Sequence, residues 1–274
     1  MKYTLVAAGL LAMPAAPGCG IARKNVPEPL GGRPLLLKNL NLVDVVSGQV
    51  LENAWLLVDN GTIVSRGVGP ADTPPGRLVF DMKNRYLIPG LIEAHCHSTA
   101  SPIFSMRMVD TMRHTRQLKH NFVATIESGV TTIRDMGAFS GLLRYFIRQI
   151  EDGSLPGPRV TYCNSILNVM GGHPEIPPTD MNLFAKPMSL FIGMIMDNFR
   201  DTEEMEECLE KNARGASFIK LSMDAQTLFC KKNKEIPVYT RDQLDRVFRF
   251  AEKKGLPVSG HLHYKSGFDR ALEY

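Results

Sequence analysis

From residue 85 onward the chain repeats one pattern, and this repeat limits the folds open to it more than any other feature. Apolar segments of strand length lie at residues 87–94, 130–133, 159–163, 218–221 and 257–260. Between them lie segments with apolar residues at helical spacing. Five strand-then-helix units in series predict an α/β protein with a parallel sheet and right-handed connections. The pattern leaves open whether that sheet is open or closed into a barrel.

Two of the expected helices carry start signals in their sequence. Asp201 with Glu204, and Thr240 with Gln243, match the capping box, in which side chains bond the free backbone N–H groups of the first turn. Gly255 follows the second helical segment, and glycine is the usual residue just past a helix end. We therefore expect helices that begin after Asp201 and after Thr240.

A different rhythm precedes the repeat. Between residues 35 and 80, apolar residues alternate along short strands that are separated by the turn signals Ser47-Gly48 and Asn60-Gly61. Asn-Gly between two apolar runs is a strong hairpin signal. We expect a small β domain over residues 34–84, marginal in stability if left alone, and a separate α/β domain over residues 85–274.

The first 20 residues form a further segment. One lysine precedes an apolar run, and small residues then lead to Cys19. The run is shorter than the about 20 residues of a membrane-spanning helix and suits the core of a signal peptide. Cys19 follows Ala-Pro-Gly, a poor version of a bacterial lipoprotein cleavage box. We expect export to the periplasm, or lipid anchoring at Cys19 as the link to a membrane. The alternative is a cytoplasmic protein with a misplaced start codon.

Residues 21–33, rich in proline and glycine, predict a linker.

Composition excludes some classes of partner. The 274 residues include 32 Lys+Arg and 28 Asp+Glu, for a net charge of +4, and 44% are hydrophobic. This balance, without a basic cluster interleaved with aromatic residues, predicts no nucleic-acid partner. It also excludes a disordered chain. Five scattered cysteines imply no disulfide framework.

The sharpest chemical signal is His95-Cys96-His97, at the end of the first strand of the repeat. Residues two apart on a strand point to the same side, so two imidazoles can bind one metal ion. Cys96 then points to the opposite side, and we expect it to pack rather than to ligate. A purely structural role for the two histidines is the alternative.

Lys220 lies within the otherwise apolar strand Ser-Phe-Ile-Lys-Leu-Ser, where burial of a cation is costly. One interpretation is that its stem packs while its ammonium reaches water. The other is that its amine has reacted with carbon dioxide. The resulting carbamate is an anionic oxygen ligand able to bridge two metal ions, and this interpretation depends on the nearby histidines.

His261 and His263 follow Val258 at the C-terminal end of another predicted strand. A (β/α) barrel carries its active site at that end of its strands. His261 is therefore a candidate further metal ligand. His263 is a candidate substrate-binding residue, with a plain loop histidine as the alternative.

Two candidates lie at the ends of other strands. Asp135 ends the second strand and is placed to orient a ligand histidine from outside the ligand set. It could equally cap the next helix or pair with Arg134. His173 lies in a Gly-Gly-His-Pro loop and is placed to polarise a substrate carbonyl, with an ordinary turn as the alternative.

Four segments, in this order, resemble motifs of the amidohydrolase superfamily of metal-dependent hydrolases. The segment PGLIEAHCHS is similar to the signature P-G-[LF]-[IV]-D-x-H-x-H-x, and GVTTIRDMG to the second-strand motif. FIKL is similar to the strand of the metal-bridging lysine, and LPVSGHLHY to the fifth-strand histidine motif. The resemblance runs from about residue 34 to the end. It implies a partial TIM (β/α)8 barrel of about five units, preceded by part of a small β-sandwich.

Within the superfamily, the lysine strand and the Gly-Gly-His loop are most similar to the prolidase- and dipeptidase-related branch. The resemblance implies that two divalent metal ions, usually zinc, are bridged by carboxylated Lys220 and held by His95, His97 and His261. It implies a metal-activated hydroxide that hydrolyses the C–N bond of a small amide, dipeptide or cyclic amide. His173 would contact the substrate or the transition state.

The chain departs from the family pattern. Glu93 stands where Asp is usual, and Tyr264 where a small residue is common. The family also uses a histidine from the sixth strand and an aspartate from the eighth. A full barrel takes about 250 residues, so we expect a fragment of such an enzyme, with weak metal binding and no turnover by itself.

Two alternatives remain. One is a mononuclear imidazolonepropionase- or deaminase-like amidohydrolase. The other, from a different class, is a non-catalytic half-barrel binding protein that buries its open strand edge in a homo-oligomer or against a partner.

Overall fold

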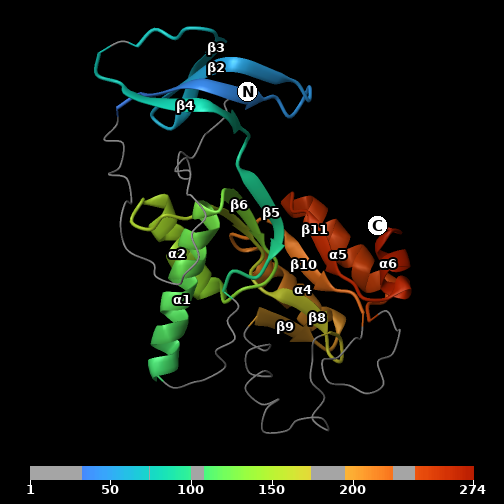
Figure 1. Cartoon of the computed structure of the whole chain (residues 1–274). Helices are drawn as coiled ribbons and strands as arrows, with labels where there is room; N and C mark the ends of the chain where they lie inside the picture. Colours follow the sequence, from blue (N-terminus) through green and yellow to red (C-terminus); the bar gives the residue numbers. More distant parts are fainter. Residues whose placement is uncertain (1–32, 74, 100–107, 174–194, 225–237) are drawn as a thin grey trace. The chain divides into compact units, whose positions relative to one another are not determined.

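The computed structural model describes residues 33–73, 75–99, 108–173, 195–224 and 238–274 (Figure 1). The segment expected to be a signal peptide, Cys19 and nearly all of the expected linker lie outside the described residues. The chain divides into two units, one comprising the residues up to Leu91 together with 127–131, and the other the rest of the chain from Ile92 to Tyr274.

The first unit is built on one four-stranded sheet with the order β3-β2-β1-β4. Its strands are β1 (Leu35–Val43), β2 (Val50–Asp59), β3 (Thr62–Val68) and β4 (Leu78–Leu87). The predicted hairpin is confirmed: β2 and β3 pair antiparallel around Asn60 and Gly61, whose φ angles are 45° and 71°. Positive φ at both central residues is the backbone that a type I′ turn requires. Strand β4 pairs parallel to β1, which local alternation did not predict.

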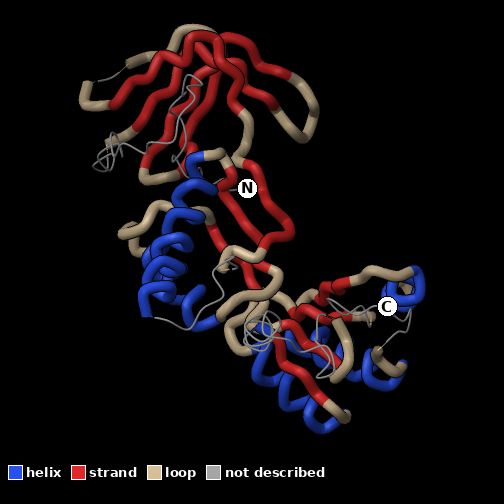
Figure 2. Tube along the Cα trace, turned by 60° about the horizontal axis from the view of Figure 1, so that its bottom comes forward, coloured by secondary structure: helices blue, strands red, loops and turns tan. Residues whose placement is uncertain are grey.

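The second unit alternates strands and helices. Its strands are β5 (Leu91–Cys96), β6 (Val130–Asp135), β7 (Arg159–Tyr162), β8 (Ile166–Val169), β9 (Met196–Phe199), β10 (Ile219–Ser222) and β11 (Val258–His261). Its helices are α1 (Met108–Glu127), α2 (Ser140–Glu151), α4 (Thr202–Ala213), α5 (Arg241–Lys254) and α6 (Lys265–Ala271). Figure 2 shows this alternation along the trace, with strands in red and helices in blue.

The strands of the second unit form two sheets, β5-β6-β7 and β11-β10-β8-β9. The pairs β6–β7, β8–β9, β8–β10 and β10–β11 are parallel. The third predicted strand, residues 159–163, corresponds to β7, whereas β8 and β9 were not predicted. The predicted α/β class is confirmed, and the strand–helix series is that of a partial TIM-like barrel.

The first predicted strand of the repeat, residues 87–94, is wrong in its bounds. Strand β4 ends at Leu87 and β5 begins at Leu91, with Pro89 and Gly90 between them. Proline lacks the N–H that a sheet ladder needs, so a break at this point follows from its chemistry.

The helix signals are confirmed in different degrees. Helix α5 has the complete capping box of Thr240 and Gln243, and Gly255 ends it with φ 66°. Helix α4 has half of one: Asp201 accepts from the Glu204 N–H at 3.0 Å, but the Glu204 carboxylate accepts from the backbone N–H of Arg200 and pairs with its guanidinium. A cation one residue outside the helix therefore displaces the local bond.

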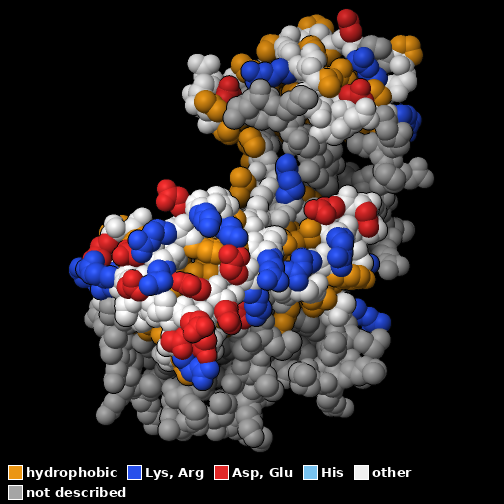
Figure 3. Space-filling view, turned by 180° about the vertical axis from the view of Figure 1, so that it is seen from behind, with side chains coloured by type: hydrophobic (Ala, Val, Ile, Leu, Met, Phe, Trp, Pro, Cys, Tyr) orange, Lys and Arg blue, Asp and Glu red, His pale blue; other side chains and the backbone are white. Residues whose placement is uncertain are grey.

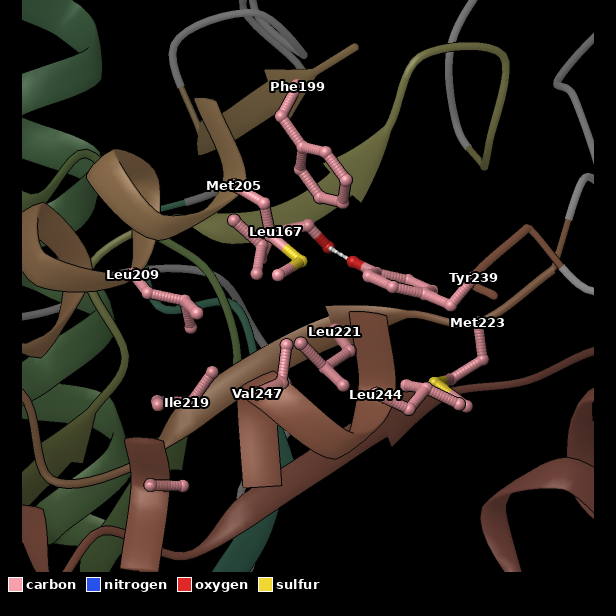
Figure 4. Close-up of a cluster of buried hydrophobic side chains, with 11 residues drawn as sticks. Leu167, Phe199, Met205, Leu209, Ile219, Leu221, Met223, Tyr239, Leu244 and Val247 are labelled. Atoms are coloured by element: carbon pink, nitrogen blue, oxygen red, sulfur yellow. Dashed lines mark hydrogen bonds between the residues drawn. The ribbon is translucent and has the colours of Figure 1, made fainter. Parts of the chain in front are cut away.

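A buried apolar cluster joins β8 and β10 to α4 and α5 (Figure 4). Ile219 and Leu221 of β10 point into it. Tyr239 is buried there, and its hydroxyl donates to the Leu167 carbonyl at 2.7 Å. Because side chains alternate along a strand, Lys220 and Ser222 face the opposite side of β10. The core thus determines which residues of this strand are available for chemistry.

The surface charges are mixed in sign. Figure 3 shows basic and acidic side chains interspersed on one face of the molecule. Exposed ion pairs such as Arg246–Glu206 and Lys254–Glu210 link α5 to α4. Such pairs contribute only about 0.2–1 kcal/mol each, so the apolar core dominates the packing of these helices. Among the helices that the structure describes, none has the length and apolar character needed to cross a membrane.

Candidate metal centre

His95 lies in β5 and His97 directly follows that strand, and their ring centroids are 5.7 Å apart. The Nδ1 atom of His97 lies 3.0 Å from the carbonyl oxygen of Gly137, and this bond requires a proton on Nδ1. The Nε2 atom of His97 is then left with its lone pair. Burial and then the charge of Lys220 lower the pKa of His95. The first feature directs Nε2 of His97 away from Gly137, and the second favours the neutral imidazole of His95, the form that binds a metal ion.

Asp135 is fully buried at the end of β6. One carboxylate oxygen accepts from the Ser98 N–H at 2.8 Å and from its hydroxyl, and the other accepts from the Gly137 N–H at 3.1 Å. Burial raises the pKa of Asp135, against the opposing effect of these bonds. Its carboxylate thus acts on His97 indirectly. It holds the backbone of Ser98, the next residue in the chain, and that of Gly137, whose carbonyl bonds the His97 ring.

Lys220 of β10 has a relative exposure of 0%. This excludes the interpretation in which its ammonium reaches water. Its Nζ lies 3.4 Å from the Gly260 carbonyl oxygen, a weak bond for a cation. Burial lowers the pKa of Lys220 to about 8. Its charge in turn contributes to the lowered pKa of both His95 and His261, so it lies within electrostatic reach of both.

Three histidines converge at the ends of β10 and β11. His261 ends β11, opposite Ser222 of β10. Its Nε2 lies 3.1 Å from the Nε2 of His263. The ring of His173 stacks on that of His261, with centroids 4.6 Å apart and planes 2° apart, and it meets the edge of His263 at 4.3 Å. One nitrogen from each of the three lies within 4.8 Å of the others.

Burial lowers the pKa of His261 to about 3, and the neighbouring His173 and Lys220 add to this effect. An imidazole with this pKa is neutral throughout the neutral range. A neutral imidazole is the form that binds a metal ion.

Asp224, which the sequence reasoning missed, organises this cluster. It is fully buried, and its carboxylate lies 2.8 Å from Nδ1 of His263. It also accepts from the N–H groups of His263 and Tyr264. Burial would raise the pKa of Asp224, but these hydrogen bonds hold it below its ordinary value. The sequence does carry a signal that Asp224 faces the site. Lys220, Ser222 and Asp224 are two residues apart, so they lie on one side of β10 and its extension.

The Gly-Gly-His loop is anchored to the same strand end. The Ser222 hydroxyl donates to the His173 carbonyl at 2.6 Å, and the His173 N–H donates to the Asp224 carbonyl at 3.0 Å. Strand β10 and the residues directly after it therefore supply Lys220 and hold both His173 and His263. The structure groups His95 with His97, groups His173 with His261 and His263, and puts Lys220 within reach of both groups.

Comparison with known proteins identifies the family. The model of the amidohydrolase family matches residues 86–273. The chain belongs to the amidohydrolase family. Its fold is similar to that of a prolidase solved with N-methylphosphonate-L-proline, with a TM-score of 0.71 and 22% identity over 88% of this chain and 59% of that one. It is also similar to ochratoxinase from A. niger, with a TM-score of 0.68 and 19% identity over 88% of this chain and 58% of that one.

Curated relatives with higher identity match over shorter segments. An adenine deaminase of Kosmotoga olearia is 35% identical over 89 residues, which are 32% of this chain and 15% of that protein. An adenine deaminase of Clostridium acetobutylicum is 33% identical over 99 residues, or 36% and 14% of the two chains. The matched segments thus span about a seventh of these relatives, and the whole structural neighbours are longer than this chain.

Members of this family generally bind divalent metal ions, and the donors in this structure fit such an ion. Nitrogen binds zinc at about 2.0–2.1 Å, so two imidazole nitrogens on one ion lie roughly 3–3.5 Å apart. The 3.1 Å between Nε2 of His261 and Nε2 of His263 lies in that range. His97 and His263 each have an oxygen partner on Nδ1, the outer contact typical of metal-binding histidines.

Proposed function

We propose that this amidohydrolase is a metal-dependent hydrolase acting on the C–N bond of a small amide, dipeptide or cyclic amide. The observation that carries the proposal is the fully buried Lys220, within electrostatic reach of histidines on both β5 and β11. Among the described residues no carboxylate forms an ion pair with Lys220, and a buried lysine in that state is costly as a cation and useful once converted to an anion. The fold shared with a prolidase favours the prolidase- and dipeptidase-related branch.

In this proposal His95, His97, Lys220 and His261 hold two divalent ions, with zinc as the expected metal. The bound ions would supply polarisation of the substrate carbonyl and a water whose pKa is near 7. The chain positions the ligands: the Gly137 carbonyl holds the His97 ring, and Asp135 holds the backbone of Gly137 and of Ser98.

The environment of Lys220 supports its carboxylation. Only the neutral amine attacks carbon dioxide, and a pKa of about 8 leaves a larger neutral fraction at neutral pH than an ordinary lysine has. Nζ forms a bond to the carbon of carbon dioxide and loses one proton, which leaves an anionic carbamate. The change replaces a buried cation with an anion beside neutral imidazoles, the charge that a pair of divalent ions stabilises.

His173 is proposed to contact the substrate carbonyl. Its backbone is held by the Ser222 hydroxyl and the Asp224 carbonyl, so its ring starts from a defined position beside His261. A preorganised imidazole N–H stabilises negative charge that develops on a carbonyl oxygen.

The test is the detection of the carbamate. The full chain is loaded with zinc in ¹³C-bicarbonate and examined by carbon NMR, with metal content measured in parallel. With zinc in excess, because metal binding by this chain is expected to be weak, we expect a carbamate signal and two zinc ions per chain in the parent. Lys220→Ala should lose the signal and the second ion, whereas Lys253→Ala, at an exposed lysine of α5, should keep both. A parent without a carbamate and with one ion per chain would overturn the binuclear proposal.

A second candidate is a mononuclear deaminase, favoured by the 35% identity to the adenine deaminase of Kosmotoga olearia. Adenine and Xaa-Pro dipeptides are therefore the two substrates to compare. Loss of adenine absorbance, with Lys220 as a plain amine, would favour the deaminase. Release of proline, with a carbamate present, would favour the dipeptide hydrolase.

A further inference from the structure

The histidine cluster at the end of β11 contains more converging nitrogens, and more hydrogen bonds that hold them, than one metal ligand requires. Of these three histidines, the function proposed above uses His261 as a metal ligand and His173 as a substrate contact, and it gives His263 no role. Yet the nitrogens of all three converge within 4.8 Å. Each of the two additional histidines is also held from outside by the end of β10. One ligand role for His261 does not explain why the other two histidines are held beside it.

Asp224 determines which nitrogen of His263 faces the cluster. Its buried carboxylate accepts a hydrogen bond from Nδ1–H, so in the neutral ring Nε2 carries the lone pair. That lone pair points to Nε2 of His261 at 3.1 Å, which in the metal-free chain donates its N–H. An ion can take the place of this proton when His261 moves its proton from Nε2 to Nδ1. No net proton change is needed for the exchange.

His173 requires a movement of its ring. Its plane lies 2° from that of His261, and the in-plane lone pairs of two parallel rings cannot meet at one ion. Its backbone is fixed by the Ser222 hydroxyl and by the Asp224 carbonyl. Rotation about Cβ–Cγ is therefore the movement that brings a nitrogen of His173 to the ion, and it breaks the stack.

We propose that His173, His261 and His263 form a three-histidine site for a divalent first-row transition metal of the zinc type, with Asp224 as the positioning residue. Imidazole nitrogens suit zinc, copper and nickel among such ions. A carboxylate–histidine–metal arrangement is the usual outer support of a zinc site. The site uses His261 but neither His95 nor His97, so it does not rest on the function proposed above.

The test removes the β5 pair first. In the full chain with His95→Ala and His97→Ala, titration with Co²⁺ should give one tightly bound ion with visible d–d absorption, displaced by Zn²⁺. Adding Asp224→Asn should weaken this binding by about 10–100-fold, the usual cost of losing an outer partner. Adding His263→Ala or His173→Ala should weaken it further than that. Adding His120→Ala, at an exposed histidine of α1, should change nothing.

Two results would overturn the proposal. One is that the variant lacking the β5 pair binds no Co²⁺ while the parent binds it through His95 and His97. The other is that Asp224→Asn and His263→Ala bind as tightly as the His120→Ala control. If a histidine variant does not fold, X-ray absorption of the variant lacking the β5 pair, with one equivalent of Zn²⁺, decides the matter. Three imidazoles in the zinc shell support the site, and fewer than three contradict it.

Discussion

The chain contains two His-x-His pairs, one on β5 and one at the end of β11, and the structure treats them differently. The rings of His95 and His97 lie 5.7 Å apart, and a backbone carbonyl holds His97. The ring centroids of His261 and His263 lie 4.5 Å apart, and a buried carboxylate holds His263 directly. The same His-x-His spacing in the sequence therefore does not give the same distance between the two imidazole rings. The two pairs also differ in the acceptor of their Nδ1 bond, a backbone carbonyl for His97 and a carboxylate for His263.

The largest expected effect comes from removing the two buried carboxylates. Asp224→Ala and Asp135→Ala each leave several buried donors without an acceptor, and an unsatisfied donor costs about 1–3 kcal/mol. We expect each variant to lose about 3–5 kcal/mol of unfolding free energy in urea. Asp152→Ala, which removes an exposed loop carboxylate, is the control and should lose well under 1 kcal/mol.

The two carboxylate variants also separate the two pairs. In NMR spectra, Asp224→Ala should shift the ring signals of His263, because its Nδ1 loses its partner. Asp135→Ala should leave them in place. Equal shifts of the His263 ring signals in both variants would show that the two histidine pairs are coupled, and would contradict the difference between them.

Lys220→Met removes the charge that both pairs share. A folded pKa of about 8 against an ordinary 10.5 means that the buried cation costs stability at pH 7 in the metal-free chain. We expect the substitution to raise the unfolding free energy by about 2–3 kcal/mol. It should also raise the pKa of His95 and of His261, which NMR titration measures. A fall in stability would show that Lys220 is not a strained cation.

The pH dependence of the parent has the corresponding sign. Between pH 8 and 10.5 the unfolded chain binds the Lys220 proton and the folded chain does not, so stability from this group rises with pH. Lys220→Met should lack this rise. Denaturant midpoints at pH 8 and pH 10 in the two proteins provide the measurement.

Lowering the pH should destabilise the folded chain through His261 of the β11 cluster. The folded pKa of His261 is about 3, below the ordinary 6.5, so stability from this group is lost as pH falls from 6.5 toward 3. Between pH 7 and pH 5 we expect the metal-free parent to lose about 2 kcal/mol more than His261→Gln. Equal losses in the two proteins would mean that His261 is not held neutral by its surroundings.

The smallest expected effects come from two hydroxyls. Ser98 donates to Asp135 beside the β5 pair, and Ser222 donates to the His173 carbonyl beside the β11 cluster. Ser98→Ala and Ser222→Ala should each cost about 1 kcal/mol in urea unfolding. Only Ser222→Ala should shift the ring signals of His173. A shift of these signals in Ser98→Ala would contradict the separation of the two groups.

Several features of the fold could be predicted because they depend on neighbours along the chain. Alternation put Lys220 on the side of its strand away from the core formed by Ile219 and Leu221. Thr240 and Gln243 completed a capping box because both partners lie within one turn. The same reasoning succeeded only in part for Glu204, where Arg200 competed for the carboxylate.

Other features depended on residues far apart in sequence. Asp224 bonds His263 across 39 positions, and Ser222 bonds the His173 carbonyl across 49. Nothing in the local pattern around Asp224 announces a histidine partner, because the pairing of β10 with β11 brings the two together. The same holds for Gly137, whose carbonyl reaches His97 across 40 positions.

The sequence by itself thus determined the α/β series, the sites of helices α4 and α5, and the shared side of residues two apart on a strand. Backbone periodicity fixes these properties from residue to residue. Only the tertiary structure decided that Lys220 is fully buried, that Asp224 selects the free nitrogen of His263, and that His173 joins the β11 pair. Burial and hydrogen-bond partners arise when strands meet, so no local pattern encodes them.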